Sequence, residues 1–74
     1  MKHDNRQAAI IRQHVSQIID TALVNTPFKE LAKKSDVYPA ALSRMYSEIP
    51  VSLICMCKVL EALGYELIIQ KKEW

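Results

Sequence analysis

The chain has 74 residues, of which ten are Lys or Arg, eight are Asp or Glu and two are Cys. This length is that of one small domain, so residues 1–74 are expected to form a single unit. Half of the residues are hydrophobic, yet no uninterrupted apolar run reaches the roughly 18 to 20 residues of a membrane span. The composition excludes a membrane-spanning protein, and the surplus of apolar residues predicts a surface that binds another protein chain.

The distribution of charge is uneven along the chain. Residues 1–44 hold seven basic and four acidic side chains, a balance of +3, whereas residues 45–74 hold three and four, a balance of −1. The first 44 residues are therefore the candidate for a surface that faces phosphates. Residues 1–6 have neither the apolar core nor the cleavage site of a secretory signal, which predicts a cytoplasmic protein with reduced cysteines.

The first three predicted helices follow from periodicity and from two prolines. Apolar residues recur every three or four positions over residues 6–24, as in an amphipathic helix. Two short helices are expected over residues 27–34 and 39–47, each with a proline in its first turn. Thr26 is the predicted cap of the second helix, and Asp36 is the predicted left-handed residue of the turn that follows it.

A fourth helix is expected over residues 53–63, with Ser52 as its cap and Gly64 as a left-handed stop. It is apolar nearly all round, so one side should face the core and the other a second chain. Residues 65–70 alternate like a β-strand but have no second strand to pair with, so pairing with a twin subunit is expected. The predicted dimerisation segment is 53–70, with interface residues Leu53, Ile54, Met56, Leu67 and Ile69.

The segment FKELAKKSDVYPAALSRMYSE has the helix lengths and inward-facing residues of a helix-turn-helix, with its core over residues 27–47. Ala32 is small where the two helices cross, and Leu42 and Met45 should fix the second helix on the first. Such a helix fits the major groove, where Arg can donate two hydrogen bonds to guanine and Ser can bond either way. A surface ion pair with Glu48 is the alternative for Arg44.

The stretch LAKKSDVYPAALSR resembles the pattern LAxxxGVSxxxISR of the Cro-like, or XRE-type, family of phage repressors and prophage regulators. The later stretch PVSLICMCKVLEALGYELII is similar to the family's fourth helix and following segment, notably in its prophage antitoxin branch, so the resemblance covers residues 26–69. Three residues depart from the family pattern: Asp36 replaces Gly, Tyr38 replaces Ser and Phe28 replaces Gln.

The resemblance implies an all-α, four-helix helix-turn-helix DNA-binding domain with a short C-terminal β-strand that pairs across a dimer. It implies a transcription regulator, expected to act as a repressor, that binds an operator in double-stranded DNA as a homodimer. The EIPVSL junction is also similar to phage activators of the same superfamily. Carried over by position, the DNA-binding residues are Thr26, Lys29, Tyr38, Ala40, Ser43, Arg44 and Ser47.

Catalysis is not expected. One Gly leaves no phosphate-binding loop, and Cys55 and Cys57 point to opposite sides of a helix, without metal-ligand spacing to His3 or His14. No enzyme activity, cofactor or metal is predicted. The alternative function is an antitoxin that binds a partner toxin and autoregulates its operon, although no toxin-wrapping tail follows the predicted strand. A helical adaptor without DNA binding is the third alternative.

Overall fold

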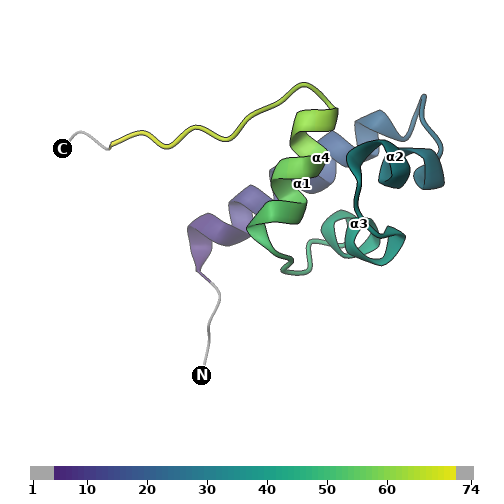
Figure 1. Cartoon of the computed structure of the whole chain (residues 1–74). Coiled ribbons are helices and arrows are strands. Elements are labelled where there is room, and N and C mark those ends of the chain that lie inside the picture. The colour runs from purple at the N-terminus through teal and green to yellow at the C-terminus, as the bar shows by residue number, and fades with distance from the viewer. Residues whose placement is uncertain (1–4, 72–74) are drawn as a thin grey trace.

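The computed structural model describes residues 5–71, which contain four α-helices and no β-strand. In chain order, the helices are α1 (Arg6–Ala22), α2 (Phe28–Ser35), α3 (Pro39–Tyr46) and α4 (Leu53–Ala62). Figure 1 shows α2 and α3 together at one end of the molecule, with α4 lying across α1. The predicted all-α class is confirmed, and each predicted helix is present with bounds that differ by one or two residues.

Two of the helices begin at a polar side chain that accepts a backbone hydrogen bond. Asn5 Oδ1 accepts from the N–H of Ala8 at 2.8 Å, which caps α1. The predicted Ser52 cap of α4 is confirmed, since its hydroxyl accepts from the N–H of Cys55 at 3.2 Å. The predicted Thr26 cap of α2 is wrong. Residue 26 is still part of the turn that closes α1, so Pro27 takes the capping position without a side-chain bond.

Helices α2, α3 and α4 end in the same way, on a residue with left-handed backbone. These residues are Asp36 (φ 59°), Glu48 (φ 64°) and Gly64 (φ 85°). The next N–H donates to the carbonyl five residues back, at 3.1 Å after α2, 2.8 Å after α3 and 2.7 Å after α4. This pattern satisfies carbonyls that have no partner within the helix. The predictions for Asp36 and Gly64 are confirmed, whereas Glu48 was not predicted because glutamate has no preference for this conformation.

Each helix places two hydrophobic side chains in the core. Pairs of helices pack together: α1 on α3, α2 on α4 and α2 on α3. Burying a side chain of Val, Leu, Ile or Met contributes about 1.5 to 3 kcal/mol, so the four pairs are the main source of stability. The predicted inward orientation of Leu42 and Met45 is confirmed. The buried hydrophobic residues are Val15, Ile19, Leu31, Ala32, Leu42, Met45, Val59 and Leu60.

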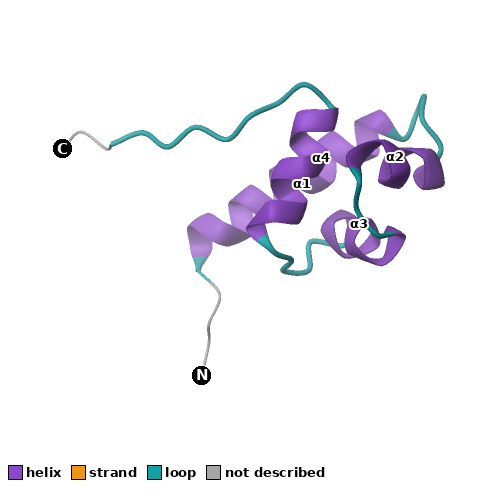
Figure 2. Ribbon diagram, in the orientation of Figure 1, coloured by secondary structure: helices purple, strands orange, loops and turns teal. Residues whose placement is uncertain are grey.

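Residues 65–71, which follow α4, are extended and are not paired as a strand with any part of residues 5–71. Figure 2 shows this segment as loop, running away from the helices. The predicted strand over residues 65–70 is therefore not found within the single chain. The physical reason is that all other described elements are helices, so none offers a row of free N–H and C=O groups to pair with.

Candidate nucleic-acid interface

Helix α3 has a buried face and an exposed face. Leu42 and Met45 point into the core, at 0% and 3% exposure. At 100° per residue, four exposed residues cluster about the opposite side, whereas Pro39 and Tyr46 are exposed at the two ends of the helix. This exposed face continues into the residue that ends the helix. It consists of Ala40, Ser43, Arg44 and Ser47, which were all predicted to contact DNA.

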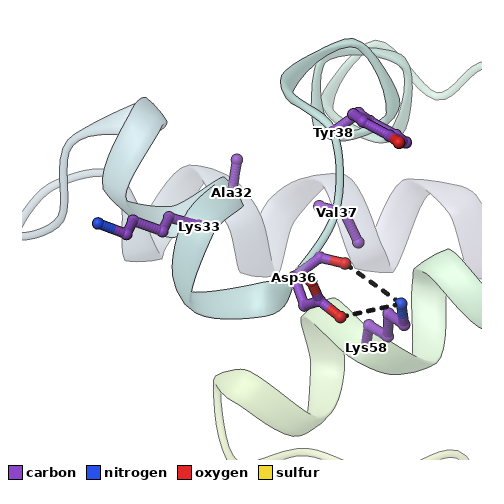
Figure 3. Close-up of a pocket in the computed structure, with 6 residues that line it drawn as sticks. All are labelled: Ala32, Lys33, Asp36, Val37, Tyr38 and Lys58. Carbon is purple, nitrogen blue, oxygen red and sulfur yellow. Dashed lines mark hydrogen bonds and ion pairs between the residues drawn. The ribbon is translucent and has the colours of Figure 1, made fainter.

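Tyr38 lies at the beginning of the exposed face of α3. Its backbone is extended (φ −69°, ψ 145°) and it precedes Pro39, the first residue of the helix. The proline ring disfavours a helical conformation for the residue before it. Tyr38 is consequently outside the helix, with 83% of its surface exposed. Figure 3 shows its ring at the start of α3.

The other two predicted DNA contacts lie on a different element, at the beginning of α2. Lys29 is exposed in the first turn of the helix, whereas Thr26 is half-buried before it. Thr26 lines a shallow depression of about 590 Å³ with Asn25, Glu30, Lys33 and Lys34. The seven predicted residues thus form two groups, five along α3 and two at α2, and Thr26 is the least accessible of them.

Arg44 has no hydrogen-bond or ion-pair partner for its guanidinium within residues 5–71. The alternative prediction, an ion pair with Glu48, is not formed. Glu48 has a left-handed backbone at the end of α3, and its carbonyl accepts a hydrogen bond from Arg12 Nε at 3.1 Å. The guanidinium of Arg44 therefore keeps its five donors available to a ligand.

Helix α1 holds the C-terminal end of α3 through three polar side chains, Arg12, Ser16 and Asp20. Besides the Arg12 bond, Ser16 Oγ donates to the carbonyl of Tyr46 at 2.7 Å, and Tyr46 Oη donates to Asp20 Oδ1 at 2.8 Å. Their spacing of four residues places all three on one stripe of α1. The sequence prediction missed these contacts, although the stripe was visible as polar residues at helical spacing.

The Tyr46 hydroxyl is perturbed by this contact. Its hydrogen bond to the Asp20 carboxylate raises the pKa of Tyr46 above the ordinary value of 10.0, and the negative charge of Asp20 and burial act in the same direction. The bond requires the phenol to keep its proton. The neutral side chain is therefore the form that ties α3 to α1.

The turn between α2 and α3 is held by α4. Lys58 Nζ lies 3.2 Å from Asp36 Oδ2 and 3.3 Å from the Asp36 carbonyl oxygen. Figure 3 shows both contacts at the edge of a depression of about 370 Å³ that Tyr38 and Lys33 also line. This contact was also missed, because the sequence does not indicate which face of α4 meets the turn.

The residues predicted for a dimer interface are mostly exposed. Leu53 and Ile54 on α4 are 62% and 69% exposed, and Leu67 and Ile69 in the extended segment are 45% and 98% exposed. Met56 differs from them, because it is half-buried and packs against the core. Helix α4 and the segment after it thus present apolar side chains that residues 5–71 leave largely exposed.

Cys55 and Cys57 are both half-buried free thiols. Within residues 5–71 no three His, Cys, Asp or Glu side chains are grouped so that they could bind a metal ion, and His3 lies outside the described residues. No helix in the same range has the length and hydropathy needed to cross a membrane.

Comparisons with protein families, with curated proteins and with solved structures gave no significant match to the chain.

Proposed function

We propose that this protein is a sequence-specific DNA-binding transcription regulator of the helix-turn-helix type, which binds its operator as a homodimer. The observation that supports this most directly is the exposed face of α3. Ala40, Ser43 and Arg44 project from a short helix whose opposite side is anchored in the core. A helix mounted in this way can enter the major groove while the rest of the domain stays outside it.

The lengths of the two helices and of their connection support the helix-turn-helix assignment. Asp36, Val37 and Tyr38 alone separate α2 from α3. Ala32 is 1% exposed, and its small side chain permits close packing in the core shared by α2 and α3. The turn is closed by the N–H of Val37, which donates to the carbonyl of Ala32 at 3.1 Å. This short, hydrogen-bonded connection keeps the second helix at a fixed angle to the first.

Each exposed side chain of α3 has a chemistry suited to a base edge. The Arg44 guanidinium can donate two parallel hydrogen bonds to guanine, and the Ser43 hydroxyl can donate or accept. The Ala40 methyl can contact the methyl of thymine. Lys29, at the start of α2, has a charge suited to a backbone phosphate, which would fix the position of the domain without reading sequence.

The homodimer is supported by exposed apolar side chains on α4 and in the segment that follows it. Leu53 and Ile54 are exposed on α4, and Leu67 and Ile69 lie in the extended segment with 45% and 98% exposure. Two copies that pair these segments as antiparallel strands would satisfy the free backbone groups of each. A two-fold dimer would also place two copies of α3 on two operator half-sites.

The test is selection of bound sites from random duplex DNA by the full chain. The proposal predicts enrichment of a palindromic consensus whose half-sites are about 10 base pairs apart, centre to centre. An Arg44→Ala chain should not enrich that consensus. Failure of the wild-type chain to enrich any sequence, with the helix content intact by circular dichroism, would contradict the proposal.

An antitoxin is the second candidate function, and the same exposed apolar residues favour it. In that case Leu53, Ile54 and Ile69 would be covered by a toxin, and DNA binding would serve to autoregulate the operon. A toxin-sized reading frame beside the gene, whose product forms a stoichiometric complex with the chain, would support this candidate. A chain that forms a homodimer but no such complex would favour the regulator alone.

A further inference from the structure

The side chain of Lys58 makes two contacts with one residue of the turn before α3. Its ammonium reaches both the carboxylate of Asp36, at 3.2 Å, and the backbone carbonyl of the same residue, at 3.3 Å. Lys58 belongs to α4, 22 positions further along the chain. Two contacts to one residue restrict both the side chain and the peptide plane of Asp36 (Figure 3).

The peptide plane of Asp36 affects the direction in which α3 begins. Asp36 has the left-handed conformation that ends α2, and only two residues separate it from Pro39. The carbonyl of Tyr38 already accepts the first hydrogen bonds of α3, from Ala41 and Leu42. A rotation of the peptide that follows Asp36 would therefore turn α3 as a unit relative to α2.

We propose that Lys58 is a positioning residue for DNA recognition, which fixes the angle of α3 by holding Asp36. This inference rests on the proposed function, because it assigns Lys58 a role in how α3 meets the DNA. Lys58 acts here through Asp36 and not by touching a base. Asp36 supplies what a glycine at the same left-handed position would lack, a carboxylate for Lys58 to bind.

The exposure of the pair indicates an effect on geometry more than on stability. The side chains of Lys58 and Asp36 are 43% and 91% exposed, and exposed ion pairs contribute little to the free energy of unfolding. Recognition of a base edge, by contrast, depends on hydrogen bonds that weaken steeply when they are misaligned. Loss of the contact should therefore reduce specific DNA binding while the fold remains.

The experiment uses Lys58→Met, which keeps the aliphatic stem but removes the ammonium, and Lys58→Arg, which can restore both contacts. Lys71→Met is the matched control, because it removes the same charge from an exposed residue of the extended segment. Affinity is measured for the selected consensus and for random duplex DNA, at two salt concentrations. Hydrogen exchange of the Ala41 and Leu42 amides reports on the start of α3.

The expected result for Lys58→Met is an affinity for the consensus about three- to tenfold lower, a fraction of the loss from removing a base-contacting Arg. Affinity for random DNA should match that of Lys71→Met, and Lys58→Arg should recover the consensus affinity. The Ala41 and Leu42 amides should exchange faster in Lys58→Met, while the amide of Ile19 in α1 is unchanged.

Four results would overturn the inference. Equal losses on consensus and random DNA, with a smaller salt slope, would make Lys58 a direct phosphate contact. A parallel fall in thermal stability and in exchange protection of Ile19 would make its role purely structural. Unchanged consensus affinity would reject positioning while leaving the proposed function intact, whereas a wild-type chain that binds no duplex DNA would reject both.

Discussion

Tyr46 Oη donates a hydrogen bond to Asp20 Oδ1 at 2.8 Å, and this contact joins residues 26 positions apart. It ties the last residue of α3 to α1, beside the bond from Ser16 to the Tyr46 carbonyl. The end of the proposed recognition helix is therefore held by a phenol that must remain protonated. This requirement makes the attachment of α3 sensitive to alkaline pH.

The raised pKa of Tyr46 predicts a loss of stability at high pH. Because the folded state holds this proton more tightly than the unfolded state, the contribution is fully present below about pH 10, the ordinary value. It declines as the pH rises above 10.0 through the raised pKa of the folded state. Tyr46→Phe should lower the free energy of unfolding at pH 7 and remove this part of the alkaline decline.

Urea unfolding of both chains between pH 7 and pH 11 provides the measurement. Tyr38→Phe is the matched control, because its side chain is 83% exposed at the start of α3. The difference in free energy of unfolding between the wild type and Tyr46→Phe should shrink above pH 10, and Tyr38→Phe should have little effect on stability at pH 7. A difference for Tyr46→Phe that is independent of pH would contradict the raised pKa.

Replacing Glu48 with glycine should stabilise the protein. Glu48 has φ 64°, a conformation that strains residues with a Cβ by roughly 1 to 2 kcal/mol. Glycine removes this strain but makes the unfolded chain more flexible, so the net gain should be up to about 1 kcal/mol. The carbonyl that accepts from Arg12 is unchanged by the substitution.

Thermal unfolding compares Glu48→Gly with Gln13→Gly. Gln13 is exposed in the middle of α1, where glycine should lower stability by about 1 kcal/mol. The unfolding temperature should rise for Glu48→Gly and fall for Gln13→Gly. A loss of stability in both would indicate that the Glu48 side chain makes a stabilising contact.

Removing the hydroxyl of Ser35 should also raise stability. Ser35 is 4% exposed, and its Oγ has no hydrogen-bond partner within residues 5–71. A buried polar group without a partner destabilises the folded state by about 1 to 3 kcal/mol, and Ser35→Ala removes it. Alanine is also the better helix former in α2. The midpoint of chemical unfolding should rise for Ser35→Ala and change far less for Ser43→Ala, whose site is exposed.

Arg44→Ala should abolish specific DNA binding without loss of helix content. Each guanine contact by an Arg contributes about 1 to 3 kcal/mol per subunit, which is roughly 5- to 150-fold in affinity, and the free energy doubles in a dimer. Lys29→Ala should instead weaken all sequences about equally and lower the salt slope by about one per contact. A mobility-shift titration on consensus and random DNA separates the two, and unchanged consensus affinity for Arg44→Ala would remove it from the interface.

Ile69→Lys should dissociate the proposed dimer. Ile69 is 98% exposed in the single chain, and its burial between two copies would contribute up to about 3 kcal/mol per side chain. The substitution would also place like charges near the two-fold axis. Operator binding should therefore be lost together with the dimer. Gln70→Lys is the control, because neighbouring residues of a strand point to opposite faces.

Sedimentation at micromolar concentration measures the outcome. The wild type and Gln70→Lys should sediment as dimers, and Ile69→Lys as an 8.5 kDa monomer. A stable wild-type monomer would reject both the strand pairing and the two-half-site operator.

Local signals in the sequence specify the four helices, because their apolar periodicity, the Ser52 cap and the stops at Asp36 and Gly64 depend only on neighbouring residues. They also specify that Leu42 and Met45 face inward, since a spacing of three places both on one side of α3. Local signals wrongly predicted that Thr26 caps α2, because the turn that closes α1 includes the same residue. They also gave no indication of the left-handed backbone at Glu48.

The attachment of α3 to the rest of the domain depends on contacts between residues far apart in the chain. The bonds from α1 to Tyr46 and Glu48, and from Lys58 to Asp36, join residues 22 to 36 positions apart. No periodicity specifies such pairs, because they depend on which faces of the helices meet once the core has formed. The extended segment after Gly64 differs from these contacts, because its pattern can be seen in the sequence but its pairing cannot form within residues 5–71. Its alternation is visible in the sequence, but a strand forms only where a second edge exists, and the single chain has none within its described residues.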